Sequence, residues 1–327
     1  MTSRIDWESQ IGKRLRLRDL YVFSTVVRLG SMGKAALELG VSQPAVSEVI
    51  ADLEHAVGAR LFDRTPRGVE PTAEGSSLER HVVAAFDELK QGMKDIEFLS
   101  DPTVGEVRIG CPESISAAIL QVICETFTQQ YPRVVLDVDT VNTLSFAQKL
   151  RDRHLDVVLA RGGWPLEDEQ LVADFRVETL YDDELVIAVG CQSPWARRRK
   201  VDISELRDEQ WILTSGDRLN YQVIANAFRT RGVEVPKIGM KTISVHLRAS
   251  MVATGRFVTT FPRSVLDLHG DRFGLKVLPV DIPNANWPVK IATLRNRSMS
   301  AVVERFIACA SKIAKSDSDR KRVNRSK

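Results

Sequence analysis

The chain of 327 residues has no apolar run long enough to cross a membrane and no secretory signal pattern at its start. These absences exclude a membrane-spanning protein and predict a cytoplasmic one with no membrane partner. Cysteine is sparse: Cys111, Cys124, Cys191 and Cys309 form neither a CxxC pair nor a metal-site spacing. The five histidines are scattered. No metal site is predicted, and a redox role for Cys111 or Cys191 is disfavoured.

Motifs of common enzymes are also missing. The chain has no GxSxG, Walker or dinucleotide-binding glycine motif. An enzyme needs titratable groups paired at one site, and nothing in the sequence brings the nearest candidates, Glu113 and His154, together. We therefore predict no catalytic residue, no cofactor and no enzymatic activity.

Charge of one sign does not dominate the chain. The formal net charge is +3, yet residues 1–100 hold 13 Lys and Arg against 15 Asp and Glu. The surplus lies in residues 312–327, with 7 basic and 2 acidic residues, and 316–327 is expected to be a basic disordered tail. The basic run 13–18 suits either DNA-backbone contacts or a solubilising leader. Net charge therefore does not indicate nucleic-acid binding.

A helix-turn-helix pattern is present in residues 18–58. Apolar residues recur at helical spacing in three stretches: Leu20, Phe23 and Val27; Ala35, Ala36 and Leu39; Val46, Val49, Leu53 and Val57. Gly40 suits a helix end that needs positive φ, and Ser42 is a good N-cap. Pro44 falls in the first turn, where its missing N–H costs nothing. The turn is so short that the third helix can project into a major groove.

The residue types in this region carry a family resemblance. They are Ala35-Ala36, Val41-Ser42-Gln43-Pro44-Ala45-Val46-Ser47, Leu53-Glu54, Gly58, Leu61-Phe62, Arg64, Thr72 and Gly75. The pattern resembles the N-terminal domain of LysR-type transcriptional regulators, which implies a winged helix-turn-helix that binds double-stranded DNA. One residue departs from it: Glu48 stands where the family very commonly has Arg or Lys. A carboxylate there can accept from a cytosine amino group or point to solvent.

The resemblance and the chemistry of the side chains select candidate DNA contacts. They are Lys34, Ser42, Gln43, Pro44, Ala45, Ser47, Glu48, Arg64, Thr65 and Arg67. Gln43 can bond adenine bidentately, and Ala45 can meet a thymine methyl group. Arg64, Thr65 and Arg67 resemble the family's wing and suit phosphates. The alternative for any single Arg or Lys is a solvated surface charge.

A long helix is predicted from Thr72, its cap, to about Leu99. Its apolar residues follow alternating steps of three and four, interrupted only at Gly92, and so form a heptad seam: Leu78, Val82, Ala85, Leu89, Ile96 and Leu99. The seam pairs either with a second copy or with the helix's own domain. We favour a dimer through this helix, and the resemblance further implies a tetramer. Gly92 is a candidate hinge.

After Asp101-Pro102 the chain alternates strands and helices. We predict strands at 104–110, 134–141, 155–160, 180–189, 211–214, 257–260 and 291–294, and helices at 115–131, 145–153, 219–231, 245–253 and 300–314. This order indicates a largely parallel sheet and two lobes, with crossing strands near 176–181 and 278–282. It resembles the family's effector domain, which is similar to periplasmic solute-binding proteins.

Effector contacts are expected where strands end, because ligands of open parallel sheets bind there. The candidates are Ser114, Asn142, Thr143, Arg161, Thr214, Ser215, Ser244 and Phe261. Ser114 opens a helix, which favours an anion, and Arg161 can pair with a carboxylate or phosphate. The alternatives are caps or turns for the hydroxyl residues and Asn142, and a salt bridge between lobes for Arg161.

The predicted fold class is α+β: a mostly α winged helix-turn-helix with a long linker helix, then a two-lobed α/β effector domain. The predicted segments are an N-terminal extension (1–17), a DNA-binding domain (18–72), a linker (73–101), an effector domain (102–315) and the tail. Lobe I takes in about 102–178 and 283–315, and lobe II about 179–282.

The sequence predicts a ligand-responsive regulator that binds a palindromic promoter site as a dimer or tetramer. Its effector is small and either anionic or sugar-like, and RNA polymerase is a further candidate partner. Residues 181–186, 193–196 and 211–213 resemble the family branch of galactose-binding-protein and aromatic-catabolism regulators. The alternative is a small-molecule binding protein whose N-terminal helices only oligomerise.

Overall fold

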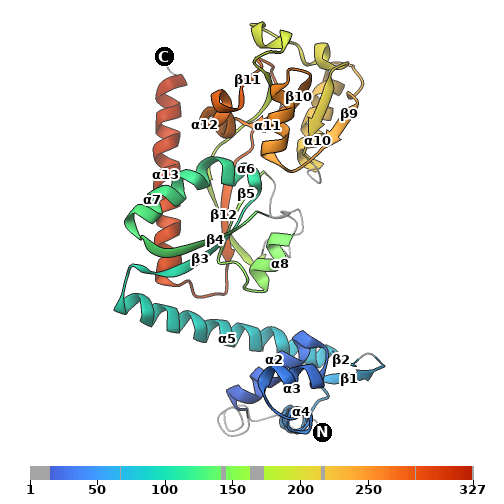
Figure 1. The fold of residues 1–327 in the computed structure, drawn as a ribbon, viewed down its shortest axis with the longest axis vertical. Helices are drawn as coiled ribbons and strands as arrows, with labels where there is room; N and C mark the ends of the chain where they lie inside the picture. The colour runs from blue at the N-terminus through green and yellow to red at the C-terminus, as the bar shows by residue number, and fades with distance from the viewer. Residues whose placement is uncertain are drawn as a thin grey trace. The chain divides into compact units, whose positions relative to one another are not determined.

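The computed structural model describes residues 15–66, 68–140, 145–162, 173–214, 218–283 and 285–325. The chain divides into two compact units, Met1–Gly92 and Met93–Lys327 (Figure 1). Arg67, Asn142, Thr143 and Ser215, four of the predicted contact residues, lie outside the described residues, as does most of the N-terminal extension.

The first unit contains the predicted helix-turn-helix. Its elements are α2 (Leu17–Leu29), α3 (Met32–Leu39), α4 (Gln43–Val57) and the hairpin of β1 (Phe62–Thr65) with β2 (Gly68–Pro71). The Ser31 and Ser42 hydroxyls accept hydrogen bonds from backbone N–H groups in the first turns of α3 and α4, each at 3.4 Å. Gly40 ends α3 with φ of 67°. Local capping chemistry therefore sets these helix ends, at Gly40 and Ser42 as predicted.

The buried stripe of α4 differs in part from the prediction. Val46, Ile50 and Leu53 are buried, whereas Val49 and Val57 are only partly buried against the same core. Val49 and Ile50 both follow Val46 at a spacing that stays on one face of a helix with 3.6 residues per turn. The fold buries Ile50 and leaves Val49 partly exposed.

The predicted long helix is α5 (Ala73–Ser100). The Thr72 hydroxyl accepts a hydrogen bond from the Gly75 N–H at 3.0 Å, as a cap should. Val82 is buried in the core of the first unit. By contrast Leu89, Ile96 and Leu99 of the predicted seam are exposed, Leu99 by 81%. The C-terminal half of the seam is thus not covered by described residues of this chain.

The second unit contains two five-stranded sheets, one in each lobe. In lobe I the strand order is β4-β3-β5-β12-β6, and in lobe II it is β11-β7-β10-β8-β9. The strands of lobe I are β3 (Val104–Gly110), β4 (Arg133–Asp139), β5 (Val157–Arg161), β6 (Phe175–Tyr181) and β12 (Val289–Leu294). Those of lobe II are β7 (Leu185–Gly190), β8 (Gln210–Leu213), β9 (Ile238–Lys241), β10 (Phe257–Pro262) and β11 (Leu275–Val277).

Four strand pairs are parallel: β3–β4, β3–β5, β8–β9 and β8–β10. The antiparallel pairs are β5–β12 and β6–β12 in lobe I, and β7–β10 and β7–β11 in lobe II. The sheets are thus mixed, with parallel strands ending together at one edge of each lobe. Of the predicted effector residues, Ser114 and Arg161 lie at the edge in lobe I and Thr214 at the edge in lobe II.

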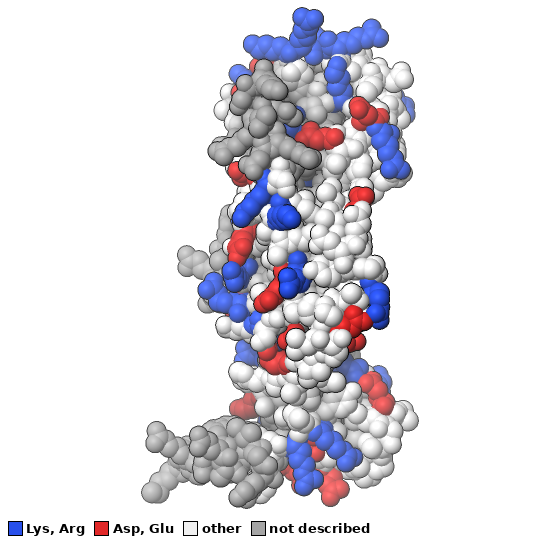
Figure 2. All heavy atoms as spheres, turned by 90° about the vertical axis from the view of Figure 1, so that its left-hand side faces the viewer, with Lys and Arg blue, Asp and Glu red and all other residues white. Residues whose placement is uncertain are grey.

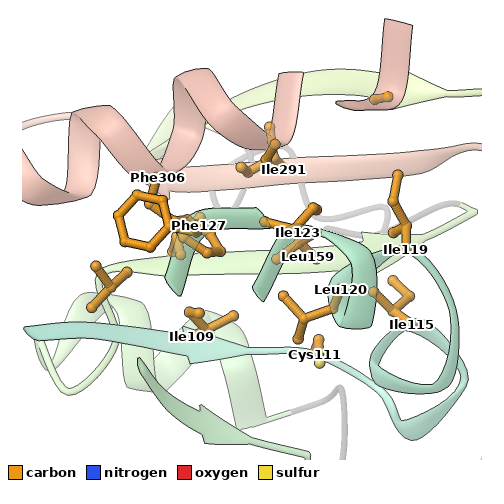
Figure 3. Packing of buried hydrophobic residues seen from close by; sticks show 14 of the residues in the cluster. Ile109, Cys111, Ile115, Ile119, Leu120, Ile123, Phe127, Leu159, Ile291 and Phe306 are labelled. Atoms are coloured by element: carbon orange, nitrogen blue, oxygen red, sulfur yellow. The ribbon is translucent and has the colours of Figure 1, made fainter. Parts of the chain in front are cut away.

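Helices cover both sheets. Lobe I has α6 (Glu113–Ile115), the π-helical turn η1 (Ser116–Leu120), α7 (Gln121–Gln130), α8 (Phe146–Arg151) and α13 (Ala301–Arg325). Lobe II has two 3-10 turns, η3 (Pro194–Arg197) and η4 (Ile203–Leu206), and helices α10 (Arg218–Thr230), α11 (Val245–Ala253) and α12 (Arg263–Phe273). Figure 3 shows the main core of lobe I, in which Ile109, Ile123 and Phe127 pack together with Ile291 and Phe306.

Several sequence predictions for this unit need correction. Leu278–Ile282 is not a strand, so only the first crossing, at β6, has strand structure. The strand predicted at 180–189 is divided between β6 and β7, because the chain passes from one sheet to the other at Asp182–Glu184. β10 continues through Phe261 and Pro262. α12 and the short β9 and β11 were not predicted. α13 continues to Arg325, so most of the expected disordered tail is helical.

A buried ion-pair cluster stabilises lobe I. The Asp156 carboxylate accepts hydrogen bonds from the Arg108 guanidinium at 2.7 and 3.1 Å, and Arg297 lies 3.0 Å away. Burial raises the pKa of Asp156, but the hydrogen bonds and charge of Arg108, together with the charge of Arg297, outweigh it and leave the pKa lowered. Asp156 thus joins β3 to the start of β5 and to the loop after β12.

We expect Asp156→Asn to lower the free energy of unfolding by about 3 to 5 kcal/mol, because it removes the buried negative charge that pairs with Arg108 and Arg297. A carboxyl with a depressed folded pKa stabilises the fold above its unfolded pKa of about 4 and loses that contribution as pH falls through the folded pKa. Urea unfolding from about pH 7 to about pH 3 should therefore show a steeper acid loss for the wild type than for the variant. Equal acid slopes would contradict this role.

Candidate DNA-binding and effector sites

The start of α4 presents the predicted reading face. Ser42, Gln43, Pro44 and Glu48 are exposed, and Ala45 is half-buried. The Ser42 hydroxyl also caps the helix through the Ala45 N–H. Small and short polar side chains at an exposed helix start allow close approach to base edges. The arrangement fits a helix that enters a major groove by its N-terminus.

Two other candidates differ in their surroundings. Lys34 is exposed in the first turn of α3. Ser47 is half-buried, and its hydroxyl donates to the Met32 sulfur at 3.4 Å. Ser47 therefore contributes to the α3–α4 contact, whereas the Lys34 side chain is accessible to a phosphate.

The β1–β2 hairpin forms the wing. Arg64 is exposed and pairs in register with Val69, and Thr65 lies opposite Gly68. The Thr65 hydroxyl donates to the Gly68 carbonyl at 3.4 Å across the turn. The wing thus presents the Arg64 cation from a paired strand rather than from a loop.

Glu54 anchors the wing to α4, a role that the sequence reasoning missed. One oxygen of its carboxylate accepts from the Leu61 N–H at 2.7 Å and from the Phe62 N–H at 3.2 Å. The wing also meets the α2–α3 turn, because the Val69 N–H donates to the Gly30 carbonyl at 3.0 Å. A Cβ on Gly68 would lie 2.2 Å from that carbonyl oxygen, so the close approach requires glycine.

In lobe I the structure brings Ser114 and Arg161 together. Ser114 follows β3 in α6, and Arg161 is the last residue of β5. The Arg161 Nη2 donates to the Ser114 carbonyl at 3.2 Å. Two of the predicted effector residues therefore meet at the carboxyl ends of parallel strands, as the sequence reasoning expected.

Arg161 also forms a salt bridge, which was the alternative to an effector contact in the sequence analysis. Its Nη1 lies 2.5 Å from the Asp183 carboxylate, and the two side chains are 6% and 2% exposed. The Ser264 hydroxyl donates to the same carboxylate at 2.6 Å. Burial raises the pKa of Asp183, but the Arg161 charge and the Ser264 hydrogen bond outweigh it, so the pKa is lowered. Asp183 is therefore an ionised, buried partner of Arg161.

In lobe II a polar cluster gathers around Thr214, which follows β8. The Arg248 Nη1 donates to the Thr214 hydroxyl at 2.6 Å and to the Thr260 carbonyl at 3.2 Å. The Asn220 amide donates to the Thr214 hydroxyl at 3.3 Å, and its oxygen accepts from Thr260 at 3.0 Å. These bonds fix the Thr214 hydroxyl at the carboxyl end of β8.

Ser244 and Phe261 flank this cluster. The Ser244 hydroxyl accepts from the Leu247 N–H at 3.2 Å, so it caps α11. Phe261 is fully buried within β10, and the Arg248 guanidinium lies 4.5 Å from its ring centroid. Phe261 therefore supports Arg248 from the interior through a cation–π contact.

Arg248 is the residue that the sequence analysis missed in lobe II. It is 2% exposed, on the same face of α11 as Val245, Ala249 and Val252. An arginine within an apolar helical stripe was the available signal, because buried guanidiniums need specific polar surroundings.

The described residues do not support a catalytic, metal or redox site. His154 is exposed and Glu113 is partly exposed, and no contact joins them in the described part of the chain. No group of His, Cys, Asp and Glu side chains that could hold a metal ion occurs among the described residues. Burial raises the pKa of Cys111 to about 12 and that of Cys124 to about 11. Both remain thiols at neutral pH, which argues against redox reactivity.

A pocket in lobe I lies apart from the predicted effector residues. It is lined by Arg176, Glu178, Ile291, Thr293, Met299, Glu304, Ile307 and Ala308. These residues come from β6, β12 and α13 and from the segment between β12 and α13. The pocket shares no residue with the group around Ser114 and Arg161, and its arginine already pairs with Glu178 at 2.9 Å.

Surface charge is mixed. On the face shown in Figure 2, basic and acidic side chains are interspersed. This agrees with the small net charge of +3. Among the described helices, none has the length and apolar character needed to cross a membrane.

Two family models match the chain. The model for bacterial regulatory helix-turn-helix proteins of the lysR family matches residues 17–76. The LysR substrate binding domain model matches residues 100–314. Together they cover both the α4 reading face and the two lobes.

A curated relative and two solved structures are similar to the chain over most of its length. The HTH-type transcriptional regulator TdcA of Escherichia coli (strain K12) is 29% identical over 247 residues, covering 76% of this chain and 77% of TdcA. A full-length OxyR variant from Pseudomonas aeruginosa aligns with a TM-score of 0.62 at 21% identity, over 92% of this chain and 94% of that one. Full-length CbnR complexed with its target DNA aligns with a TM-score of 0.60 at 18% identity, over 91% and 100%.

The two structural likenesses show the fold, and the family models cover most of the sequence. The chain belongs to the lysR family and is a DNA-binding transcriptional regulator with an effector-binding domain.

Proposed function

We propose that the chain binds a palindromic promoter site as a dimer or tetramer, with the start of α4 in the major groove and the wing on the adjacent backbone. The observation that carries this proposal is the exposed set Ser42, Gln43 and Pro44 at a capped helix start, beside the exposed Arg64. Gln43 reads adenine, Ala45 meets a thymine methyl group, and Lys34, Arg64, Thr65 and Arg67 hold phosphates.

Dimerisation runs through α5. Its exposed apolar residues, Leu89, Met93, Ile96 and Leu99, favour burial against a second copy of the helix. A two-fold assembly also suits a palindromic site. We place the functional boundaries at 18–72 for DNA binding, 73–101 for the linker and 102–315 for the effector domain.

The effector binds between the lobes, at Ser114 of lobe I and Thr214 of lobe II, with Asn142, Thr143 and Ser215 as further candidates. We infer a small anionic or sugar-like molecule, because a hydroxyl that a buried guanidinium holds at 2.6 Å is a polar partner for such a ligand. Within the family, we assign the chain to the branch of galactose-binding-protein and aromatic-catabolism regulators. The protein acts in the cytoplasm, has no catalytic activity and has RNA polymerase as a candidate partner.

Arg64→Ala tests the wing. We expect it to weaken DNA binding about equally for all sequences and to reduce the slope of log affinity against log salt by about 1, because one phosphate contact is lost. Fluorescence anisotropy with promoter and unrelated duplexes over a salt series measures both. Arg229→Ala in α10, exposed and in lobe II, is the matched control. An unchanged slope for Arg64→Ala would remove it from the interface.

Glu48→Arg tests the atypical reading face. If Glu48 accepts from a cytosine amino group, the swap changes which half-site is preferred, by about 1 to 3 kcal/mol at one base pair. Selection from randomised duplexes measures the preference. An equal gain in affinity on every sequence would show that Glu48 reads no base.

Thr214→Val tests the effector site. A thermal-shift screen of sugars, sugar acids and aromatic acids first identifies a ligand. The variant should then bind it about 5- to 15-fold more weakly, because a hydroxyl partner is lost. Thr230→Val, an exposed site in the same lobe, should leave the affinity unchanged. Equal affinities for Thr214→Val and the wild type would place the effector elsewhere.

A further inference from the structure

The chain passes between the lobes twice, and the two crossings are hydrogen-bonded to each other. The first is Asp182–Glu184, between β6 and β7. The second contains Trp287, whose N–H donates to the Asp183 carbonyl at 2.6 Å. The Leu185 N–H donates to the Ala285 carbonyl at 2.8 Å. Asp183 therefore lies where any change in the angle between the lobes must be absorbed.

The Asp183 side chain joins this hinge to lobe II. One carboxylate oxygen accepts from the Ser264 hydroxyl at 2.6 Å, and the other accepts from the Ser264 N–H at 3.2 Å. Ser264 is in the first turn of α12, whose own N-cap, Pro262, offers no side-chain hydrogen bond. Asp183 thus supplies the missing acceptor, and its charge is favourable at a helix N-terminus.

The same carboxylate joins the hinge to lobe I. Arg161, at the end of β5, donates to it at 2.5 Å. The other Arg161 terminal nitrogen donates to the Ser114 carbonyl at 3.2 Å and to the Ser264 hydroxyl at 3.3 Å. One buried guanidinium therefore contacts the loop that carries Ser114, the hinge and α12 at once.

Burying the Arg161–Asp183 ion pair costs desolvation free energy, so its presence needs an explanation other than stability. A buried ion pair contributes little net stability compared with apolar residues of the same size. In addition the Arg161 Nε is buried and has no hydrogen-bond partner among the described residues, which adds a further cost. What the ion pair provides is geometry: the charge and the directed N–H donors of Arg161 fix the Ser114 loop, the hinge and α12 relative to one another.

We propose that Arg161, Asp183 and Ser264 form a latch that sets the angle between the lobes, with Asp183 as the positioning residue that holds lobe II against the Ser114 loop. Only the link to an effector rests on the proposed function. The latch itself rests on contacts within the chain.

Opening the latch should leave each lobe folded, because most of each lobe's core is its own. The cluster around Ile109 and Phe127 belongs to lobe I, and the one around Trp211 and Phe228 is centred on lobe II. Apolar packing also spans the lobes among the described residues: η1 contacts α12, and Ala118 of η1 belongs to the same cluster as Val265 and Leu266. Loss of the latch should therefore loosen the hinge locally before either core unfolds.

Asp183→Asn is the direct test. The amide replaces the charge that meets Arg161 but is nearly the same size. Hydrogen–deuterium exchange of the full-length, ligand-free protein should be at least about tenfold faster at the amides of Glu184, Ser264 and Trp287, because a charge-assisted bond is lost. The amides of Val107 and Trp211, in the lobe cores, should keep wild-type rates.

Asp156→Asn is the matched control, since it also removes a buried carboxylate that pairs with arginines in lobe I. It should leave hinge exchange unchanged relative to the lobe cores. Arg161→Gln should reproduce the hinge effect, and the double variant should add little to either single one, because the two residues act as a unit. If Asp183→Asn unfolds the protein, Ser264→Ala provides the milder perturbation, with the same hinge amides as readout.

The functional readout is the length of the DNase footprint on promoter DNA without any ligand. A latch predicts that Asp183→Asn changes the footprint while affinity for a single half-site stays within about twofold. Hinge exchange equal to wild type, or equal acceleration in the lobe cores, would overturn the latch. Faster hinge exchange together with equal ligand affinities for Thr214→Val and the wild type would keep the latch and reject the proposed effector site, so the two failures are distinguishable.

Discussion

The hydrogen bonds between the two crossings, from Leu185 to Ala285 and from Trp287 to Asp183, hold the lobes of the second unit in one arrangement. Each sheet brings its parallel strands to an edge, and these edges carry Ser114 and Arg161 in lobe I and Thr214 in lobe II. The edges can act as one site only if the crossings fix their separation. The buried Arg161–Asp183 pair, joined to both lobes, is the interaction best placed to do so.

Charge acts locally in this protein. The net charge is small, and the region that reads DNA holds slightly more acidic than basic residues. The positions of single charges are specific. Arg64 is exposed on a paired strand, Glu48 is exposed on α4, and Arg248 is buried beside Thr214. Such placement can give sequence preference and ligand selection that a bulk electrostatic field cannot supply.

The sequence predicted most accurately what depends on neighbours in the chain. Caps at Ser42 and Thr72, the glycine end of α3 and the extent of α11 follow from local backbone chemistry. It predicted that polar residues gather at strand ends because parallel strands share an edge, and Ser114 and Arg161 do meet there. It did not foresee Asp183, Arg248 or Glu54, whose partners lie in distant segments or across a tertiary contact. The crossing at 278–282 was mistaken for a strand because the order of elements shows that the chain returns to the first lobe, but not whether the returning segment has a sheet neighbour.

We propose that the start of α4 and the wing recognise a specific promoter site. DNase footprinting of the full-length protein on the DNA beside its own coding region, at low salt, tests this most directly. Two protected half-sites, with centres one or more helical turns apart on one face of the duplex, are the predicted result. Complete indifference to that DNA, or protection without any sequence preference, would contradict the account.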